Sequence, residues 1–370
     1  MTSQLFTPLR IGGLELPNRI TVAPMCQYSA VDGSMGDWHT MHLGSLAISG
    51  ASMLVMEATG VTPEGRITPH CPGLYSDANE AAMQRVADFI RGVSPIVLGV
   101  QLAHAGRKAS SHRPWQGHGP LNAGEGAWQT LAPSPLPLAA GWPAPHEMSR
   151  ADMDALTAAF VQAARRAARI GLDFVELHST HGYLLSEFLS PLANRRSDEY
   201  GGSLENRMRY PLEVFRAIRS AFPAGRFVGA KISGSDFAEG GWTPEEAVIY
   251  ARALKAEGCA YVTVSGGGVV LDAKIPPGPC YQVPFAERVK KEVGMVTGAV
   301  GLISDPQQAE SIIAGGQADF VSLARALLFN PRWPQHAAVA LGAEAVWPPQ
   351  YERGSPKLWP PGRVAGSTGR

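Results

Sequence analysis

The segment His178-Ser179-Thr180-His181-Gly182-Tyr183 gathers three side chains that can carry out proton chemistry. Two imidazole N–H groups can converge on one oxygen, and a phenol beside them can donate a proton. This combination suits an enone or phenolate oxygen, on which negative charge develops when a hydride reaches the β-carbon. Two other interpretations are open for these residues alone. The histidines could bond to backbone at a strand end, or they could belong to a zinc site, which would need a third ligand.

A repeated pattern along the chain predicts the elements that must position these side chains. An apolar helix ends in glycine, a small or polar residue follows, and a short run rich in β-branched and aromatic residues comes next, as in residues 170–175, 257–262 and 315–321. Glycine supplies a left-handed cap at the helix end, and such a run is typical of a buried parallel strand. The apolar runs of this kind are Ile20–Pro24, Met53–Glu57, Ile96–Gln101, Phe174–His178, Phe227–Ile232, Tyr261–Ser265, Met295–Ala299 and Phe320–Ala324. Eight strands alternating with helices predict an α/β fold, a single (β/α)8 TIM barrel.

Helix starts support the same layout. Thr243-Pro244-Glu245-Glu246 has the form of a capping box with proline at the first helical position. Ser149 with Asp152 predicts a second start, and Ser304, two residues before a proline, predicts a third.

Two stretches fall outside the repeat. Residues 109–147 are rich in Pro, Gly and Trp and are longer than an ordinary loop, so we expect an excursion over the barrel mouth after the third strand. Residues 347–370 are rich in Pro and Gly and have no core pattern. We therefore expect a barrel over residues 1–346 and an irregular C-terminal tail over residues 347–370.

Chemically capable residues collect where the predicted strands end, which is where barrel enzymes carry their active sites. These residues are Met25, Cys26, Ala58, Thr59, Gln101, His104, His178, His181, Lys231, Ser265, Ala324 and Arg325, together with the glycine-containing segment 298–301. Their number favours the catalytic interpretation of the histidines. The ends of the last two strands match the place where barrels often bind phosphate, and Arg325 can hold a phosphate group bidentately. The sequence therefore predicts a phosphate-bearing cofactor. A G-x-G-x-x-G motif does not follow the first strand, so the sequence does not support a Rossmann domain.

Composition narrows the class of protein. The 32 basic and 32 acidic residues cancel, whereas partners such as nucleic acids or anionic membranes usually require a basic excess. The four cysteines are widely spaced, and we expect free thiols in a reducing compartment. The sequence shows no secretory leader and no apolar stretch that could span a bilayer. We therefore expect a cytoplasmic protein with no bound metal and no nucleic-acid or membrane partner.

The motifs together resemble those of the Old Yellow Enzyme flavoproteins, specifically the bacterial branch of YqjM-like and xenobiotic-reductase-like ene-reductases. They occur in order over nearly the whole chain. They are Ala23-Pro24-Met25-Cys26-Gln27-Tyr28, Gln101-Leu102-Ala103-His104-Ala105-Gly106-Arg107-Lys108, His178-x-x-His181-Gly182-Tyr183, the segment 194–207 (NRRSDEYGGSLENR) and Thr297-Gly298-Ala299-Val300-Gly301.

The resemblance implies an FMN-dependent NAD(P)H oxidoreductase that holds FMN tightly but non-covalently. NADPH or NADH would reduce FMN and leave, and the reduced FMN would then pass a hydride to the C=C bond of an α,β-unsaturated carbonyl or similarly activated alkene. The residues implied around the isoalloxazine ring are Ala23, Pro24, Met25, Cys26, Ala58 and Gln101. Those implied around the phosphate are Gly301, Ala324 and Arg325.

The resemblance also implies roles for the substrate-side residues. His178 and His181 would bind the activating oxygen, and Tyr183 would deliver the proton to the α-carbon. Tyr28 would line the substrate side of the site. Cys26 would take part by tuning the flavin potential and would not act as a nucleophile.

One position departs from the family pattern. The family usually carries arginine beside the flavin at the end of the fifth strand, whereas this chain has Lys231, which keeps the charge but not the planar fork.

The C-terminal tail carries a second family feature. The tail segment Gln350–Gly354 resembles one that sends an arginine into the site of a neighbouring subunit. We expect Arg353 to do this in a homo-oligomer, either a dimer or a tetramer.

Other classes fit the sequence less well. An FMN barrel that reduces uridine in RNA would need a basic surface. A metal hydrolase built on His178 and His181 would need carboxylates at matching strand ends. A non-catalytic barrel would not need Tyr183 with both histidines. The multidomain dienoyl-CoA reductases share the barrel, but this chain lacks their cysteine cluster and their additional length.

Overall fold

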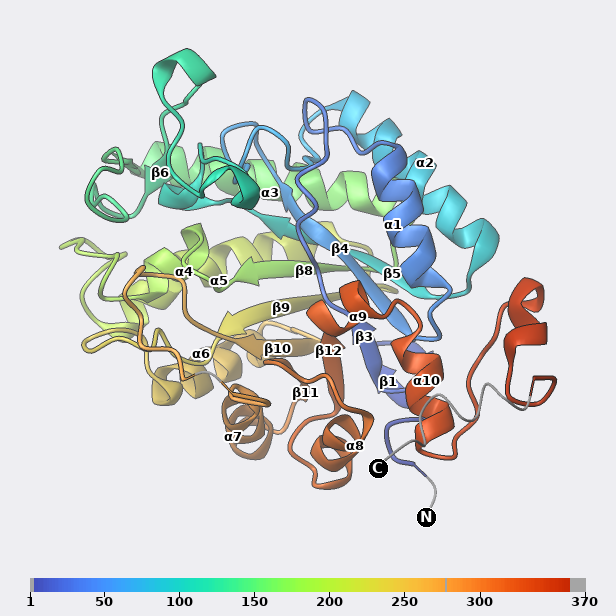
Figure 1. Cartoon of the computed structure of the whole chain (residues 1–370). Helices are drawn as coiled ribbons and strands as arrows, with labels where there is room; N and C mark the ends of the chain where they lie inside the picture. Colours follow the sequence, from blue (N-terminus) through green and yellow to red (C-terminus); the bar gives the residue numbers. More distant parts are fainter. Residues whose placement is uncertain (1–2, 277, 360–370) are drawn as a thin grey trace.

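A closed barrel of eight parallel strands forms the centre of the computed structural model, which describes residues 3–276 and 278–359 (Figure 1). The strands are β3 (Ile20–Val22), β4 (Met53–Gly60), β5 (Val97–Ala103), β8 (Phe174–Ser179), β9 (Phe227–Ser233), β10 (Tyr261–Ser265), β11 (Val296–Ala299) and β12 (Phe320–Leu323). Each strand pairs with the next along the chain, and β12 closes the barrel on β3 through Val321 and Ile20. Every predicted apolar run contributes a strand, and the (β/α)8 prediction is confirmed.

Helices connect the strands and cover the outside of the barrel (Figure 1). They are α1 (Asp37–Ala47), α2 (Asp77–Val93), α3 (Arg150–Ile170), α4 (Leu184–Leu189), α5 (Leu204–Ala221), α6 (Pro244–Ala256), α7 (Val283–Val293), α8 (Pro306–Ala314), α9 (Arg325–Phe329) and α10 (Trp333–Ala340). The predicted caps of α3 and α6 are confirmed, because Ser149 and Thr243 accept hydrogen bonds from the third residue of each helix. The predicted start at Ser304 is wrong by one residue. Asp305 is the cap of α8, because its carboxylate accepts bonds from two backbone amides.

A short hairpin that the sequence analysis did not anticipate closes the amino end of the barrel. Strands β1 (Leu9–Ile11) and β2 (Leu14–Leu16) pair antiparallel. Their apolar side chains pack on the first residues of four barrel strands, Phe174, Phe227, Tyr261 and Phe320. A Cβ atom at Gly229 would lie 2.1 Å from the Tyr261 ring, so the absence of a side chain there makes room for this aromatic layer. The amino end is therefore a filled core, and ligands must enter at the carboxyl end.

The excursion and the tail lie at different places on the barrel. The excursion between β5 and α3 contains the short strands β6 (Leu131–Ala132) and β7 (His146–Glu147) and extends beyond the carboxyl end of β8 (Figure 1). After α10, the tail runs to Trp359 and includes the 3₁₀ turn η4 (Pro349–Gly354). Residues 347–349 line a cavity with the segments that precede β4 and β5. The tail therefore begins near the amino end of the barrel, away from its own mouth.

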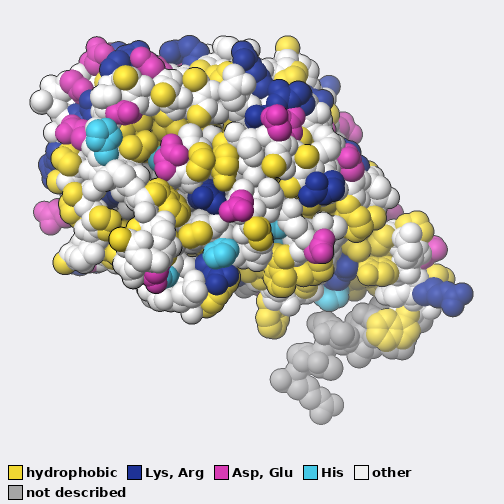
Figure 2. Space-filling view, turned by 90° about the horizontal axis from the view of Figure 1, so that it is seen from above, with side chains coloured by type: hydrophobic (Ala, Val, Ile, Leu, Met, Phe, Trp, Pro, Cys, Tyr) yellow, Lys and Arg dark blue, Asp and Glu magenta, His cyan; other side chains and the backbone are white. Residues whose placement is uncertain are grey.

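The surface mixes charges of both signs. On the face shown in Figure 2, Lys and Arg side chains are interspersed with Asp and Glu. Among the residues that the structure describes, no helix is long and apolar enough to cross a membrane.

Candidate active site

His178, His181 and Tyr183 come together at the carboxyl end of β8. His178 lies within the strand, and the other two lie on the turn that leads into α4. The His178 ring centroid is 5.3 Å from that of His181 and 4.9 Å from that of Tyr183, and the His181 and Tyr183 centroids are 6.5 Å apart. The three rings thus border one small volume, as the sequence predicted.

The surroundings keep both histidines neutral. Burial lowers the pKa of His178 and of His181 well below the usual range, and the nearby Lys231 ammonium lowers both further. A neutral imidazole donates through one nitrogen only. Nδ1 of His178 is buried and has no hydrogen-bond partner among the described residues. Nε2 of His181 lies 2.8 Å from Oγ of Ser265, at the end of β10. The pair can therefore offer hydrogen bonds to a substrate oxygen without carrying charge.

Tyr183 is held as a neutral phenol. Burial raises its pKa well above the ordinary value near 10, so that the proton stays on the oxygen throughout the neutral range. A protonated phenol beside two neutral imidazoles can act as a general acid.

The loop after β3 carries Cys26 and Tyr28 and is held by a buried carboxylate. Glu57 accepts a hydrogen bond of 2.9 Å from the Gln27 backbone, and its other oxygen lies 3.4 Å from Nε2 of His39. Burial raises the pKa of Cys26 well above 9, and Glu57 adds to the rise. Cys26 is therefore a thiol at neutral pH, which argues against a nucleophilic role. The Tyr28 ring makes an edge contact with Trp115 of the excursion at 5.8 Å.

A cavity of about 600 Å³ opens beside this trio, at the ends of β3, β9, β10, β11 and β12. Its volume lies in the range of about 300–1,000 Å³ that is usual for cofactor and small-molecule sites. Of the predicted site residues, it is lined by Ala23, Pro24, His181, Lys231, Gly301, Ala324 and Arg325. The others, Met25, Cys26, Tyr28, Ala58, Gln101, His178 and Tyr183, lie on adjacent strand ends or loops and do not line it.

One end of the cavity has the donors that an anion needs. The backbone N–H groups of Gly301, Leu302, Ala324 and Arg325 find no acceptor within the described ranges. Gly301 and Leu302 both have positive φ angles, of 109° and 56°. Successive N–H groups in such turns form concave anion sites, and the Arg325 guanidinium lines the same space. This end fits a phosphate group.

Lys231 also lines this cavity. The amine lies on β9, next to His178 of β8 in the strand register. Beneath it, the buried Glu176 accepts hydrogen bonds of 2.7 Å from Gln101 and 3.0 Å from Tyr261. Burial raises the pKa of Glu176, whereas the Lys231 charge lowers it. Lys231, which the resemblance implies as a cofactor-binding residue, thus lines the cavity above a buried carboxylate.

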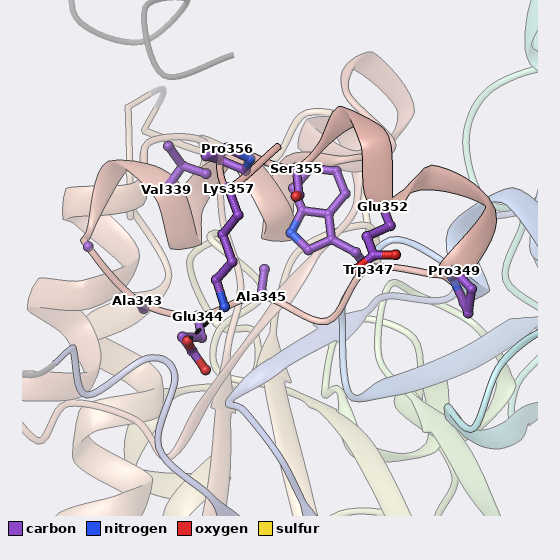
Figure 3. Close-up of a pocket in the computed structure, with 11 residues that line it drawn as sticks. Val339, Ala343, Glu344, Ala345, Trp347, Pro349, Glu352, Ser355, Pro356 and Lys357 are labelled. Atoms are coloured by element: carbon purple, nitrogen blue, oxygen red, sulfur yellow. Dashed lines mark hydrogen bonds and ion pairs between the residues drawn. The ribbon is translucent and has the colours of Figure 1, made fainter. Parts of the chain in front are cut away.

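Arg353 is not part of this arrangement within one chain. It is exposed on η4 and does not line the mouth cavity. A larger cavity of about 710 Å³ lies beside it, between α10 and the tail (Figure 3). Its labelled residues include Trp347 and an exposed ion pair of Lys357 with Glu344 at 3.2 Å. None of the predicted site residues lines this larger cavity, whereas seven of them line the smaller one. We therefore assign the active site to the smaller cavity.

Sequence reasoning missed several residues that shape the site. The sequence marks Ser265 only as a strand-end residue and Lys108 only as part of a motif. The pairing of Glu57 with His39 had no local signal, because the two residues lie on different elements. No third His, Cys, Asp or Glu joins His178 and His181 in a group that could hold a metal ion within the described residues.

Comparisons with known proteins place these observations in context. The model of the NADH:flavin oxidoreductase / NADH oxidase family matches residues 4–344. An NADPH dehydrogenase of Geobacillus thermodenitrificans (strain NG80-2) is 43% identical over 356 residues, which cover 96% of this chain and 99% of that protein. An NADPH dehydrogenase of Bacillus cytotoxicus is 37% identical over 370 residues, which cover all of both chains.

Two solved structures share the fold. Morphinone reductase is 28% identical, with a TM-score of 0.76 over 95% of this chain and 93% of that one. A 2-naphthoyl-CoA reductase complex has a TM-score of 0.82 at 24% identity, over 92% of this chain and 52% of that one. At 24% identity, the similarity to the 2-naphthoyl-CoA reductase shows a shared fold and nothing about function.

Proposed function

Because the chain belongs to the NADH:flavin oxidoreductase / NADH oxidase family, we propose that it reduces the C=C bond of α,β-unsaturated carbonyls and similarly activated alkenes. The family assignment agrees with the resemblance to the Old Yellow Enzyme flavoproteins. The observation that carries the proposal is the neutral phenol of Tyr183 beside two neutral imidazoles at the edge of the cofactor cavity. We also propose a cytoplasmic location.

The enzyme is an oxidoreductase that uses FMN and NADPH. When bound, FMN would supply the hydride-transfer chemistry between NADPH and the second substrate. The cavity fits this cofactor, since its lining includes backbone amides without acceptors, the Arg325 guanidinium and the Lys231 amine. We assign the phosphate to Gly301, Ala324 and Arg325. The ring is assigned to Ala23, Pro24, Met25, Cys26, Ala58, Gln101 and Lys231.

The protein's own contribution is to hold and protonate the alkene substrate. His178 and His181 donate hydrogen bonds to the carbonyl oxygen and stabilise the negative charge that develops there. The Tyr183 hydroxyl gives its proton to the α-carbon. Tyr28 borders the substrate on the side of the excursion, where Trp115 supports it. Cys26 remains protonated and acts on the cofactor through its polarity.

Lys231 gives a test of the cofactor assignment. We expect Lys231→Met to lower the reduction potential of the bound flavin, because the anionic reduced form loses a nearby positive charge. The shift should be tens of millivolts, since about 30 mV corresponds to 1.4 kcal/mol for a two-electron couple. Lys231→Arg keeps the charge and should change the potential less. Titration against a reference dye measures this, and equal potentials for Lys231→Met and the wild type would refute the placement of Lys231.

Arg353 gives a test of a shared active site. We propose that the enzyme is a homo-oligomer in which the tail, residues 347–370, lies against a neighbouring subunit and Arg353 enters that subunit's site. Residues 360–370 of this tail lie outside the described residues. Removal of a charged hydrogen-bond donor costs about 1.5–3 kcal/mol. Arg353→Ala should therefore weaken the binding of 4-hydroxybenzaldehyde roughly 10- to 100-fold, as measured by the change in flavin absorbance. The neighbouring Glu352→Gln is the matched control, and wild-type binding by Arg353→Ala would contradict the proposal.

Product analysis tests the proposed reaction itself. The flavin-loaded enzyme should consume one NADPH for each 2-cyclohexenone converted to cyclohexanone, with the ketone identified by mass spectrometry under nitrogen. The proposal fails if the enzyme consumes NADPH only when oxygen is present, or if the product is the allylic alcohol.

A further inference from the structure

Lys108 joins two loops of the active site. It ends the 3₁₀ turn η1 (Gly106–Lys108), which follows β5. Its Nζ donates a hydrogen bond of 2.8 Å to the backbone oxygen of His181 and another of 3.0 Å to that of Gly268. The first carbonyl lies on the turn after β8, and the second lies on the loop after β10.

The turn after β8 has a backbone that needs such support. His181 has a φ of 63°, which is uncommon for any residue other than glycine. Gly182 follows with a φ of 69°, and a Cβ atom there would lie 2.0 Å from the Gly268 oxygen. In return, a Cβ atom at Gly268 would lie 2.5 Å from the His181 oxygen. The two loops therefore pack backbone against backbone, and their carbonyl oxygens meet at one ammonium group.

The second loop is fixed independently of Lys108. Arg107 donates a hydrogen bond of 2.7 Å from its guanidinium to the backbone oxygen of Val269. The backbone N–H of Arg107 is in turn held by the buried carboxylate of Glu187 at 2.9 Å. Lys108 thus ties the backbone of the turn after β8 to a loop that is already anchored.

The same ammonium lies under the proton donor. Nζ of Lys108 is 5.0 Å from the centre of the Tyr183 ring, a distance at which a cation is attracted to an aromatic face. One side chain therefore contacts the backbone of His181 and the ring of Tyr183. Ser265 completes the arrangement by holding Nε2 of His181 at 2.8 Å.

We propose that Lys108 is a positioning residue, which fixes the His181 imidazole and the Tyr183 phenol by tying the turn after β8 to the loop at Gly268. The inference rests on the proposed function, because it assigns Lys108 to the half of the reaction that involves the alkene. Lys108 itself does not line the cofactor cavity and acts through His181, which does.

The test replaces Lys108 with Met, which has an unbranched side chain but no charge and no donor. In the flavin-loaded enzyme, we expect Lys108→Met to raise the dissociation constant of 4-hydroxybenzaldehyde roughly 10- to 100-fold, because a misplaced group has an effect of this size. Oxidation of the reduced enzyme by 2-cyclohexenone should slow by a similar factor. The rate of flavin reduction by NADPH should change by less than about threefold. This change is small compared with the effect expected on the oxidation step, which depends on the fixed geometry of the turn. Lys108→Arg should restore most of the binding, because its guanidinium can still donate to both carbonyl oxygens.

Controls separate positioning from general stability. Lys291→Met removes a lysine that is 65% exposed and pairs with Glu287 on the outer face of α7, so ligand binding by this variant should match the wild type. A lower melting temperature of Lys108→Met with an unchanged dissociation constant for the phenol would overturn the proposal. If Lys108→Met does not fold, Gly268→Ala provides the second test, since its methyl group pushes on the His181 oxygen. Wild-type phenol binding by Gly268→Ala would then overturn it.

The outcome can be distinguished from failure of the proposed function. If the wild-type enzyme does not reduce 2-cyclohexenone, the alkene assignment fails. Phenol binding to the oxidised flavin enzyme does not depend on that reaction, so it still decides whether Lys108 positions the turn.

Discussion

Tyr183→Phe is expected to slow the oxidation of the reduced enzyme by 2-cyclohexenone by about 10²- to 10⁴-fold, the usual contribution of a positioned general acid. The substitution removes only the hydroxyl, so the ring contacts with His178 and His181 can remain. Burial raises the pKa of Tyr183 well above 10, which keeps the proton available throughout the working pH range. Stopped-flow absorbance of the flavin measures the rate directly.

Two controls make the Tyr183 result specific. Reduction of the variant by NADPH needs no proton from Tyr183 and should stay close to the wild-type rate. Tyr250→Phe removes a different buried hydroxyl, which lies 3.1 Å from Ser179 on β8, and should leave the oxidation rate largely intact. Equal oxidation rates for Tyr183→Phe and wild type would show that another group or water supplies the proton.

His178→Ala is the second substitution with a large expected effect. It removes the imidazole that we propose as a hydrogen-bond donor to the substrate oxygen, and loss of one such donor costs about 10²- to 10³-fold in rate. The pKa of His178 lies well below its usual range, so this donor is a neutral imidazole throughout the neutral pH range. In the wild-type enzyme, the rate of oxidation by 2-cyclohexenone should therefore not fall between pH 6 and 8, as it would if His178 had to be a charged imidazolium.

The same variant should lose affinity for phenols, because in the proposed site a phenolate oxygen would take the place of the carbonyl oxygen. His178→Asn keeps a donor group and should fall between the wild type and His178→Ala. A His178→Ala enzyme that binds 4-hydroxybenzaldehyde normally and reacts at the wild-type rate would remove His178 from the substrate site.

Much of the barrel could be predicted because its signals are local. A glycine-capped helix followed by an apolar run is readable within about ten residues, and all the predicted runs are strands. Failures occurred where the local signal was weak or degenerate. Ser304 and Asp305 are both good caps, and only the direction of the first amides of α8 favours Asp305. Strands β1 and β2 are too short to show an alternating pattern.

In the active site, too, local features could be predicted and long-range contacts could not. His178, His181 and Tyr183 are close in sequence, and the β8 strand end brings them together, so a motif could reveal them. Contacts between distant segments could not be inferred. Lys108 reaches Gly268 across 160 positions, and His181 reaches Ser265 across 84. Such contacts depend on the closure of the barrel and on positive φ angles that no local pattern specifies.

The visible spectrum of the purified wild-type enzyme, followed under nitrogen, tests the central claim most directly. The protein should be yellow, lose its flavin absorbance when NADPH is added, and recover it when 2-cyclohexenone is added to the reduced enzyme. A colourless protein that does not take up FMN, a flavin that NADPH cannot bleach, or a reduced flavin that the enone leaves unchanged would contradict the account.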